Sequence, residues 1–164
     1  MEIGERVGRT SSKEQYCYFY RTAIFEIPMS SYTYNDDKPD DFEREPYNTL
    51  FRDKVSGKEF VLSALHAKPT DAPAELEMMP TVYDDIVNNF GTTSVIMLGD
   101  FNADCSYLTS SEKSVLSLWL DQRFQWFIED IEDTTVSTTD CAYDRFVAAG
   151  EIATFIRSAT VFNF

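Results

Sequence analysis

The chain has little of several things that common protein classes depend on. It contains one histidine, three cysteines and no CxxC pair, so a closed structural zinc site, which needs four soft ligands at short spacing, is not expected. No apolar run reaches the roughly 18 residues that a membrane-spanning helix needs, and the first residues show no apolar signal-peptide region. Lys and Arg total 14 against 28 Asp and Glu, a net charge of −14. The sequence therefore predicts neither a membrane protein nor passive nucleic-acid binding by phosphate neutralisation.

The residues that are present predict a folded protein. The 164 residues are 43% hydrophobic and 15% aromatic, which is enough for a core and excludes a disordered tail. The length fits a single domain over residues 1–164, with no repeat or linker. The acidic balance does not exclude an enzyme that cuts nucleic acid, because bound divalent cations reverse the local charge. The cysteines fit three reduced thiols or one disulfide with a spare thiol, and spacing does not choose the pair.

Apolar strands alternate with helical patterns along the chain. The pattern predicts a long strand or hairpin over 16–27, a loop over 35–41, strands over 60–65, 94–98, 124–128 and 142–149, and helices over 74–90 and 112–120. Pro80 lies inside the longer helix, where proline costs about 3 kcal/mol or kinks the helix. Nearly continuous apolar strands that alternate with helices are typical of a layered α/β fold.

Polar residues follow two of these strands. His66 comes after the strand over 60–65, and Asp100 and Asn102 come after the strand over 94–98. Ligand clefts in layered α/β proteins form at such strand ends. A carboxylate and an amide two residues apart lie on one side of an extended chain, where they can hold a divalent cation and orient a phosphate oxygen. We favour this functional interpretation over strand capping, whereas the residues alone leave a structural and a catalytic role equally open for His66.

Five motifs together resemble one protein family. They are residues 8–16 (GRTSSKEQY), 42–46 (FEREP), 64–69 (ALHAKP), 98–107 (LGDFNADCSY), and 133–135 (DTT) with 141–145 (CAYDR). In this order they resemble the pancreatic-type deoxyribonuclease I family of the endonuclease/exonuclease/phosphatase superfamily, over nearly the whole chain. The resemblance implies a four-layer α-β-β-α sandwich with its active site at one edge of the two sheets. It also implies a secreted, monomeric endonuclease that cuts double-stranded DNA to 5′-phosphate ends with Mg²⁺ and Ca²⁺.

The resemblance assigns roles to individual residues. His66 matches a catalytic histidine and Glu14 the carboxylate that orients it, an arrangement that fixes the imidazole tautomer. The remaining matches are Asp100 and Asn102 around the scissile phosphate and metal, Asp144 as a second active-site carboxylate, and Arg9, Arg44 and Tyr107 as contacts to the DNA backbone.

Two loops and one cysteine pair match further features of the family. The ligands of the first calcium loop would be Asp133, Thr135, Ser137 and Thr139; those of the second would be Asp36 or Asp37, Asp40, the Phe42 carbonyl and Glu45. Each loop also has a simpler interpretation as a solvated polar surface. Cys105 and Cys141 match a structural disulfide, which implies an oxidising compartment. Cys17 is expected to be a small buried apolar residue.

The chain also departs from the family. The family has a second catalytic histidine, in a Ser-Asp-His segment near its C-terminus, and this chain has one histidine in total. The match begins inside the family's domain and stops before its last strands, so the sandwich is expected to be incomplete at both ends. Ser12 stands where the family often has a minor-groove tyrosine, and its loss should weaken binding. Two alternatives stay open: an inactive remnant with a binding role, for which residues 3–5 suggest actin, and another phosphodiesterase of the superfamily.

Overall fold

The computed structural model describes residues 1–36 and 40–162. Its centre is a seven-stranded mixed sheet in the order β3-β5-β6-β7-β9-β8, with β4 also paired to β5. The strands of this sheet are β3 (Phe25–Glu26), β4 (Tyr32–Thr33), β5 (Tyr47–Asp53), β6 (Glu59–Ala64), β7 (Val95–Asp100), β8 (Phe124–Trp126) and β9 (Asp144–Ala149). Only β6 and β7 pair in parallel among them, because the chain between them crosses over through a helix.

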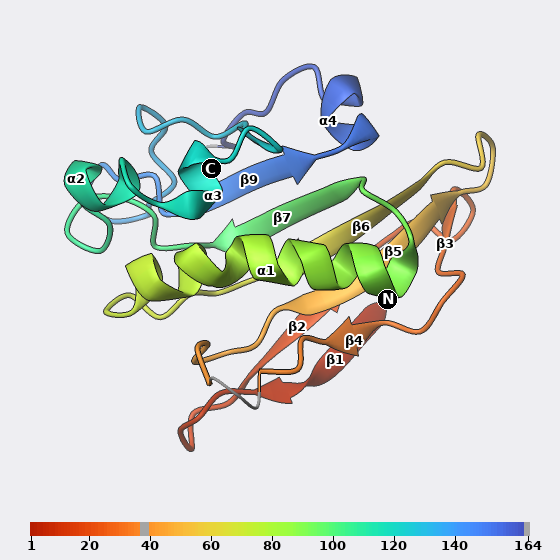
Figure 1. Ribbon diagram of the computed structural model, residues 1–164, viewed down its shortest axis with the longest axis horizontal. Coiled ribbons are helices and arrows are strands. Elements are labelled where there is room, and N and C mark those ends of the chain that lie inside the picture. The colour runs from red at the N-terminus through yellow and green to blue at the C-terminus, as the bar shows by residue number, and fades with distance from the viewer. Residues whose placement is uncertain (37–39, 163–164) are drawn as a thin grey trace.

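That crossover helix, α1 (Ala72–Phe90), covers one face of the sheet (Figure 1). Its apolar residues recur at helical spacing, and Leu76, Met79, Val82 and Ile86 are fully buried in the main core. The helix ends at Gly91, whose positive φ of 70° suits a glycine. The predicted helix over 74–90 is therefore confirmed, and it runs through Pro80. Two short helices, α2 (Ser110–Lys113) and α3 (Ser117–Leu120), follow β7, and α3 contacts α1.

The opposite face of the sheet carries a hairpin and a short helix. The hairpin, β1 (Glu2–Val7) with β2 (Glu14–Tyr18), is a separate antiparallel sheet. Tyr18 of β2 stacks on Tyr47 with ring centroids 5.8 Å apart, and its hydroxyl donates to the Tyr47 carbonyl at 2.8 Å. The helix α4 (Glu151–Phe155) packs Ala153 against the same face. Within the described residues, no helix combines the length and apolar character needed to cross a membrane.

Two predicted elements and one predicted side-chain position need correction. The strand or hairpin over 16–27 is two separate strands, β2 and β3, in different sheets. The helix over 112–120 is divided into α2 and α3, because Thr109 caps α2 in a capping box and the short α2 ends at Lys113. The predicted core position of Cys17 is wrong, since Cys17 is exposed. It pairs with Ile3, and successive strand residues point to opposite faces, so the buried side of β2 belongs to its neighbour Tyr18.

Candidate active site

The Glu14 and His66 side chains meet at the edge of the main sheet. Glu14 begins β2, and His66 lies two residues after the end of β6. The His66 Nδ1 atom lies 2.6 Å from the Glu14 Oε2 atom. The His66 backbone N–H donates to the Tyr16 hydroxyl at 2.9 Å, and burial raises the pKa of Tyr16, so this hydroxyl stays protonated. The imidazole is thus held through both its ring and its backbone.

Arg44 braces this pair from the other side. Its Nε donates to the His66 carbonyl at 2.9 Å, and its Nη1 lies 3.2 Å from the Glu14 Oε1 atom. The Arg44 side chain is only 12% exposed. Two of the guanidinium N–H groups of Arg44 are therefore used for contacts within the protein. The predicted contact between Arg44 and a DNA phosphate stays a prediction.

Asp100 lies at the other ring nitrogen of His66. The distance from His66 Nε2 to Asp100 Oδ2 is 3.8 Å. Asp100 ends β7 directly opposite Asp144 of β9. Burial raises the pKa of the Asp144 carboxyl, and the negative charge of Asp100 raises it further. Two carboxylates of like charge therefore lie opposite each other beside the imidazole, which is an arrangement that a cation would stabilise.

The chain turns sharply after Asp100. Asn102 has a positive φ of 48°, which asparagine tolerates better than most residues. Its backbone N–H donates to Asp100 Oδ1 at 3.0 Å, and its side-chain Nδ2 donates to the Ala67 carbonyl at 2.9 Å. The buried Asn102 side chain therefore ties the end of β7 to the segment that follows His66.

Gly99 allows these strand ends to approach closely. Its φ is 133°, and a Cβ atom there would lie 2.1 Å from the Leu65 carbonyl oxygen. Only glycine fits both the conformation and the space. Leu65 precedes His66 and Gly99 precedes Asp100, so the short distance between His66 and Asp100 depends on the absence of a side chain at Gly99.

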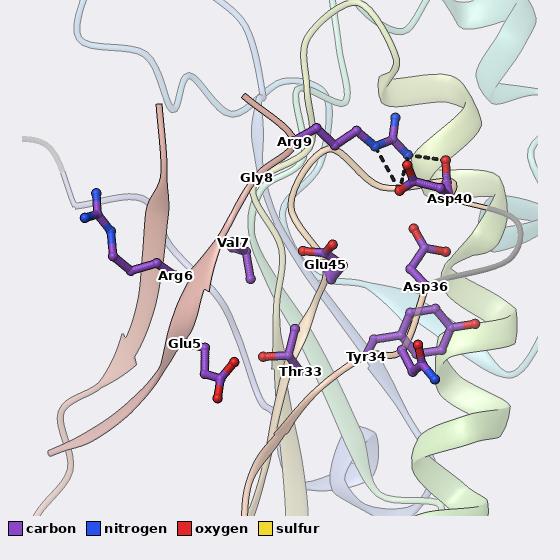
Figure 2. Close-up of a pocket in the computed structure, with 11 residues that line it drawn as sticks. Glu5, Arg6, Val7, Gly8, Arg9, Thr33, Tyr34, Asp36, Asp40 and Glu45 are labelled. Carbon is purple, nitrogen blue, oxygen red and sulfur yellow. Dashed lines mark hydrogen bonds and ion pairs between the residues drawn. The ribbon is translucent and has the colours of Figure 1, made fainter. Parts of the chain in front are cut away.

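Two predicted DNA contacts lie beside this group. The Arg9 Nε donates to Asp40 Oδ1 at 2.9 Å, as Figure 2 shows with dashed lines. Its backbone N–H donates to Glu43 at 3.2 Å. Tyr107 packs against Tyr143, the neighbour of Asp144, with ring centroids 5.2 Å apart. Both residues thus lie near the predicted site, and the Arg9 guanidinium is already paired with Asp40.

The second predicted calcium loop lines an acidic pocket of about 430 Å³ (Figure 2). Asp36, Asp40 and Glu45 share this pocket with Arg9. The Asp36 Oδ2 atom already accepts the Phe42 N–H at 2.6 Å, and burial raises the Asp36 pKa. The alternative ligand Asp37 lies outside the described residues. The structure brings the described carboxylates to one pocket, two of them with internal hydrogen-bond partners.

The first predicted calcium loop is held together by its own hydrogen bonds. Asp133 Oδ1 accepts the Thr135 backbone N–H at 2.8 Å and its hydroxyl at 2.7 Å, and these bonds lower the Asp133 pKa. The Ser137 and Thr139 hydroxyl oxygens lie 2.5 Å apart. All four predicted ligands thus converge in a loop of ionised and hydroxyl oxygens, which is the donor chemistry that Ca²⁺ prefers.

The Cys105–Cys141 disulfide is present, as the resemblance implied. It joins the chain after Asn102 to the chain before Asp144, and Asp104 adds a hydrogen bond from the Ala142 N–H at 2.8 Å. Among the described residues, Asp104 and the two sulfurs form the only group in which three ligating atoms of His, Cys, Asp or Glu side chains lie together. The sulfurs are bonded to each other, so this group is not a metal site.

The structure also shows one contributor that the sequence interpretation missed. Tyr16 accepts the His66 backbone N–H and belongs to the strand that carries Glu14. Its position two residues after Glu14 places both side chains on one face of a strand. That period-two spacing was the available signal, but a tyrosine in a strand is most often a core residue.

The fold is that of the endonuclease/exonuclease/phosphatase class. A solved protein of that family from Bacteroides vulgatus matches with a TM-score of 0.58 at 18% identity, over 90% of this chain and 65% of its own. A mannosyl-6-phosphatase from Bacteroides thetaiotaomicron matches with a TM-score of 0.57 at 15% identity, over 90% of this chain and 62% of its own. At such identities these matches establish the α/β fold and nothing about the substrate.

The sequence comparisons identify a closer relationship. Deoxyribonuclease-1 from Gallus gallus is 43% identical over an alignment of 166 positions, which covers 96% of this chain and 58% of the relative. The Homo sapiens protein is 41% identical over an alignment of 170 positions, which covers 99% of this chain and 60% of the relative. No protein-family model matches the chain. The chain is a homologue of deoxyribonuclease I, as its motifs predicted, and it spans 58–60% of the length of these relatives.

Proposed function

We propose that this chain carries the active-site part of a metal-dependent endonuclease that hydrolyses phosphodiester bonds of double-stranded DNA to 5′-phosphate products. The observation that supports it best is one imidazole with Glu14 at 2.6 Å from Nδ1 and Asp100 at 3.8 Å from Nε2. The homology to deoxyribonuclease-1 of several vertebrates supports DNA as the substrate. The proposal concerns the catalytic site that this chain contributes, and negligible cleavage by these 164 residues alone is the alternative considered below.

His66 would move one proton in this reaction. When the Glu14 carboxylate accepts the Nδ1–H, the imidazole keeps its Nε2 lone pair for a proton from the water that attacks phosphorus. Glu14 also stabilises the imidazolium that then forms. Arg44 and Tyr16 hold the His66 backbone in place and so keep the imidazole beside Glu14. This chain's own residues thus supply the base and its support.

The carboxylates beside His66 fit a Mg²⁺ ion. Asp100 and Asp144 face each other at the ends of β7 and β9, and Mg²⁺ is bound in such sites by one or two carboxylates together with substrate phosphate oxygens. A bound Mg²⁺ would stabilise negative charge that develops on the phosphate. Asn102 fixes the Asp100 carboxylate through its N–H. Burial chiefly raises the pKa of Asp144, the charge of Asp100 raises it further, and a bound cation would favour the ionised form of both carboxyls.

The remaining predicted features extend the proposal. The loop of Asp133, Thr135, Ser137 and Thr139 would bind one Ca²⁺, and Asp40 with Glu45 would contribute to a second. Arg9, Arg44 and Tyr107 would contact the DNA backbone. The complete protein would be a monomeric four-layer α-β-β-α sandwich, secreted into an oxidising compartment in which the disulfide persists.

Nicking of supercoiled plasmid in Mg²⁺ and Ca²⁺ tests the proposal. His66→Ala should lower the nicking rate by about 10² to 10⁴, the usual contribution of a positioned acid–base group. Glu14→Gln should give a smaller loss, because the imidazole remains. Lys58→Ala is the matched control, since Lys58 lies just before β6, at the end of that strand opposite His66, and its ammonium contacts Glu151 and the Phe155 ring. Chelation by EDTA should abolish nicking, and a His66→Ala protein that nicks like the wild type would refute the assignment.

A second candidate function is binding without cleavage. The chain has a single histidine, so a second imidazole for the leaving oxygen is not among its 164 residues. Under this alternative the protein binds a labelled DNA duplex in fluorescence anisotropy and leaves plasmid intact. Ile3, half-exposed on β1, marks the surface for which actin is a candidate partner, and co-sedimentation with actin filaments would test it. A panel of phosphodiester substrates would test the remaining alternative, another hydrolase of the same fold.

A further inference from the structure

A buried carboxylate that has no part in the site described above lies directly beneath it. Glu75, in the first turn of α1, has no exposed surface at all, whereas the buried carboxylates of Asp36 and Glu43 keep 8% and 7%. An ionised side chain in such a place is costly unless hydrogen bonds satisfy it. The contacts that satisfy Glu75 therefore indicate what it does.

Both Glu75 oxygens accept backbone amides from segments that carry active-site residues. Oε1 accepts the Glu43 N–H at 3.0 Å, and Oε2 accepts the Lys68 N–H at 3.3 Å. Glu43 directly precedes Arg44, and Lys68 follows His66 by two residues. Neither amide lies in a strand or helix, so no ladder bond holds it. One carboxylate thus connects two irregular segments that come from different parts of the chain.

The same two segments meet again at the site itself. There the Arg44 Nε donates to the His66 carbonyl. The connection continues through the buried Glu43 side chain, whose Oε1 atom accepts the Arg9 N–H at 3.2 Å. The segments of Arg9, Arg44 and His66 are therefore joined through two buried carboxylates, both of which receive backbone amides.

Packing alone does not account for a glutamate at this position. Residues 76, 79 and 86 of α1 bury apolar side chains of similar size in the same core, and a buried charged group gives no clear stability advantage over an apolar one. A carboxylate differs from those residues in accepting two amides at a fixed separation. That property concerns the geometry of the two segments rather than the amount of buried surface.

We propose that Glu75 is a positioning residue for the active site. By accepting the Glu43 and Lys68 amides it sets the distance between the segment of Arg44 and the segment of His66. It thereby sets the geometry of the Glu14–His66–Arg44 group, in which both segments take part. The catalytic consequence rests on the proposed function, whereas the geometric statement does not.

Glu75→Gln (E75Q) tests the geometric statement without any substrate. Glutamine keeps the shape but has one accepting oxygen, so its NH₂ faces one of the two amides. We expect amide hydrogen exchange at Glu43 or Lys68 to accelerate by about 10-fold or more. His66 is the only histidine, so its ring gives a single Hε1 NMR signal, and that signal should shift. Amides of β6 and β7 should exchange as in the wild type.

Glu77→Gln (E77Q) is the matched control. It makes the same change two residues further along α1, where the exposed Glu77 carboxylate accepts the Ser117 N–H at 2.7 Å. Exchange at Glu43 and Lys68 and the His66 signal should not change in E77Q. The proposal is overturned if E75Q leaves both unchanged, or if E77Q changes them equally. If E75Q does not fold, Glu75→Asp (E75D) replaces it: the charge remains, the shorter side chain cannot span both amides, and unchanged exchange in E75D overturns the proposal.

Plasmid nicking adds a functional measurement. In E75Q the kcat should fall by about 10-fold or more, because small misplacements of a catalytic group are costly, whereas E77Q should keep the wild-type kcat. A rise in KM at constant kcat would contradict a positioning role. If the wild-type chain does not nick DNA, the proposed function fails, and the exchange and NMR measurements still decide the role of Glu75.

Discussion

Replacement of Gly99 by alanine should destabilise the protein far more than the same change at a glycine in open space. At Gly99 a Cβ atom would lie 2.1 Å from the Leu65 carbonyl oxygen, and φ is 133°. Backbone strain of this kind costs about 1–3 kcal/mol. Forced displacement of a packed neighbour adds about 1–3 kcal/mol, and alanine returns about 0.4–1 kcal/mol through the unfolded chain. The expected loss in free energy of unfolding is about 3 kcal/mol.

Two other glycines separate the contributions to that loss. Gly57 has a φ of 72° with no atom within 4 Å of its Cβ position, so Gly57→Ala carries strain alone and should cost about 1 kcal/mol. Gly150 has a φ of 73° and would place its Cβ atom 2.2 Å from the Thr93 carbonyl oxygen. Gly150→Ala therefore has a comparable clash outside the candidate site.

Urea unfolding of the three variants measures these costs as changes in midpoint at constant m-value. Gly99→Ala and Gly150→Ala should both lose much more than Gly57→Ala. Only Gly99→Ala should also move the NMR signal of His66, because Leu65 directly precedes that residue. If Gly99→Ala loses no more than Gly57→Ala, the inference of a close approach between the ends of β6 and β7 is wrong.

The remaining predictions concern the region around β9. Serine at both Cys105 and Cys141 should lower the free energy of unfolding by about 4 kcal/mol, given a sequence separation of 36; a urea midpoint equal to that of the oxidised protein would contradict this. Asp130→Asn leaves the fully buried Arg145 guanidinium without its anion. The expected loss in free energy of unfolding is about 1–2 kcal/mol, less than for a buried pair, because the Asp130 side chain is 51% exposed. Burial raises the pKa of Asp130, but hydrogen bonds from Lys113 and Arg145 lower it overall. The ionised Asp130 should therefore contribute its full stabilisation above about pH 4, the pKa of an unfolded aspartate. That stabilisation should vanish as the pH falls through the lower pKa of the folded state. Urea midpoints measured from neutral to acidic pH should therefore converge for wild type and Asp130→Asn, and a constant gap would refute the reasoning.

The sequence predicted the elements whose apolar pattern matches their burial. The helix α1 was identified because its apolar residues recur at helical spacing and all face one core. The strand β5 was missed although it lies inside the main sheet. Its buried positions include Asn48 and Thr49, both 0% exposed, and these polar residues interrupt the apolar run that marks a buried strand.

The candidate site was predictable in membership but not in geometry. The resemblance supplied Glu14, His66, Asp100 and Asp144, and the structure brings these four together. Strand ends alone indicated His66 and Asp100. The double contact of Arg44 with Glu14 and the His66 carbonyl could not be inferred, because no local pattern encodes contacts between segments that far apart.

The same reason explains why Glu75 was overlooked. In the sequence it is one of several acidic residues near a helix start, where negative charge is favourable, and solvent exposure is the usual state of glutamate. Its burial depends on two loops that fold over it. Only the tertiary structure distinguishes it from Glu77.

Glu14 lies in the hairpin and His66 follows a strand of the main sheet, so their contact depends on how the hairpin packs on that sheet. The hairpin rests on the main sheet through Tyr18, Tyr47 and Phe51, well along β2 from its carboxylate. Beside these rings lies a mostly apolar cavity of about 430 Å³. Because β2 carries both Tyr18 and Glu14, the packing of these aromatic rings determines where the Glu14 carboxylate lies relative to the imidazole.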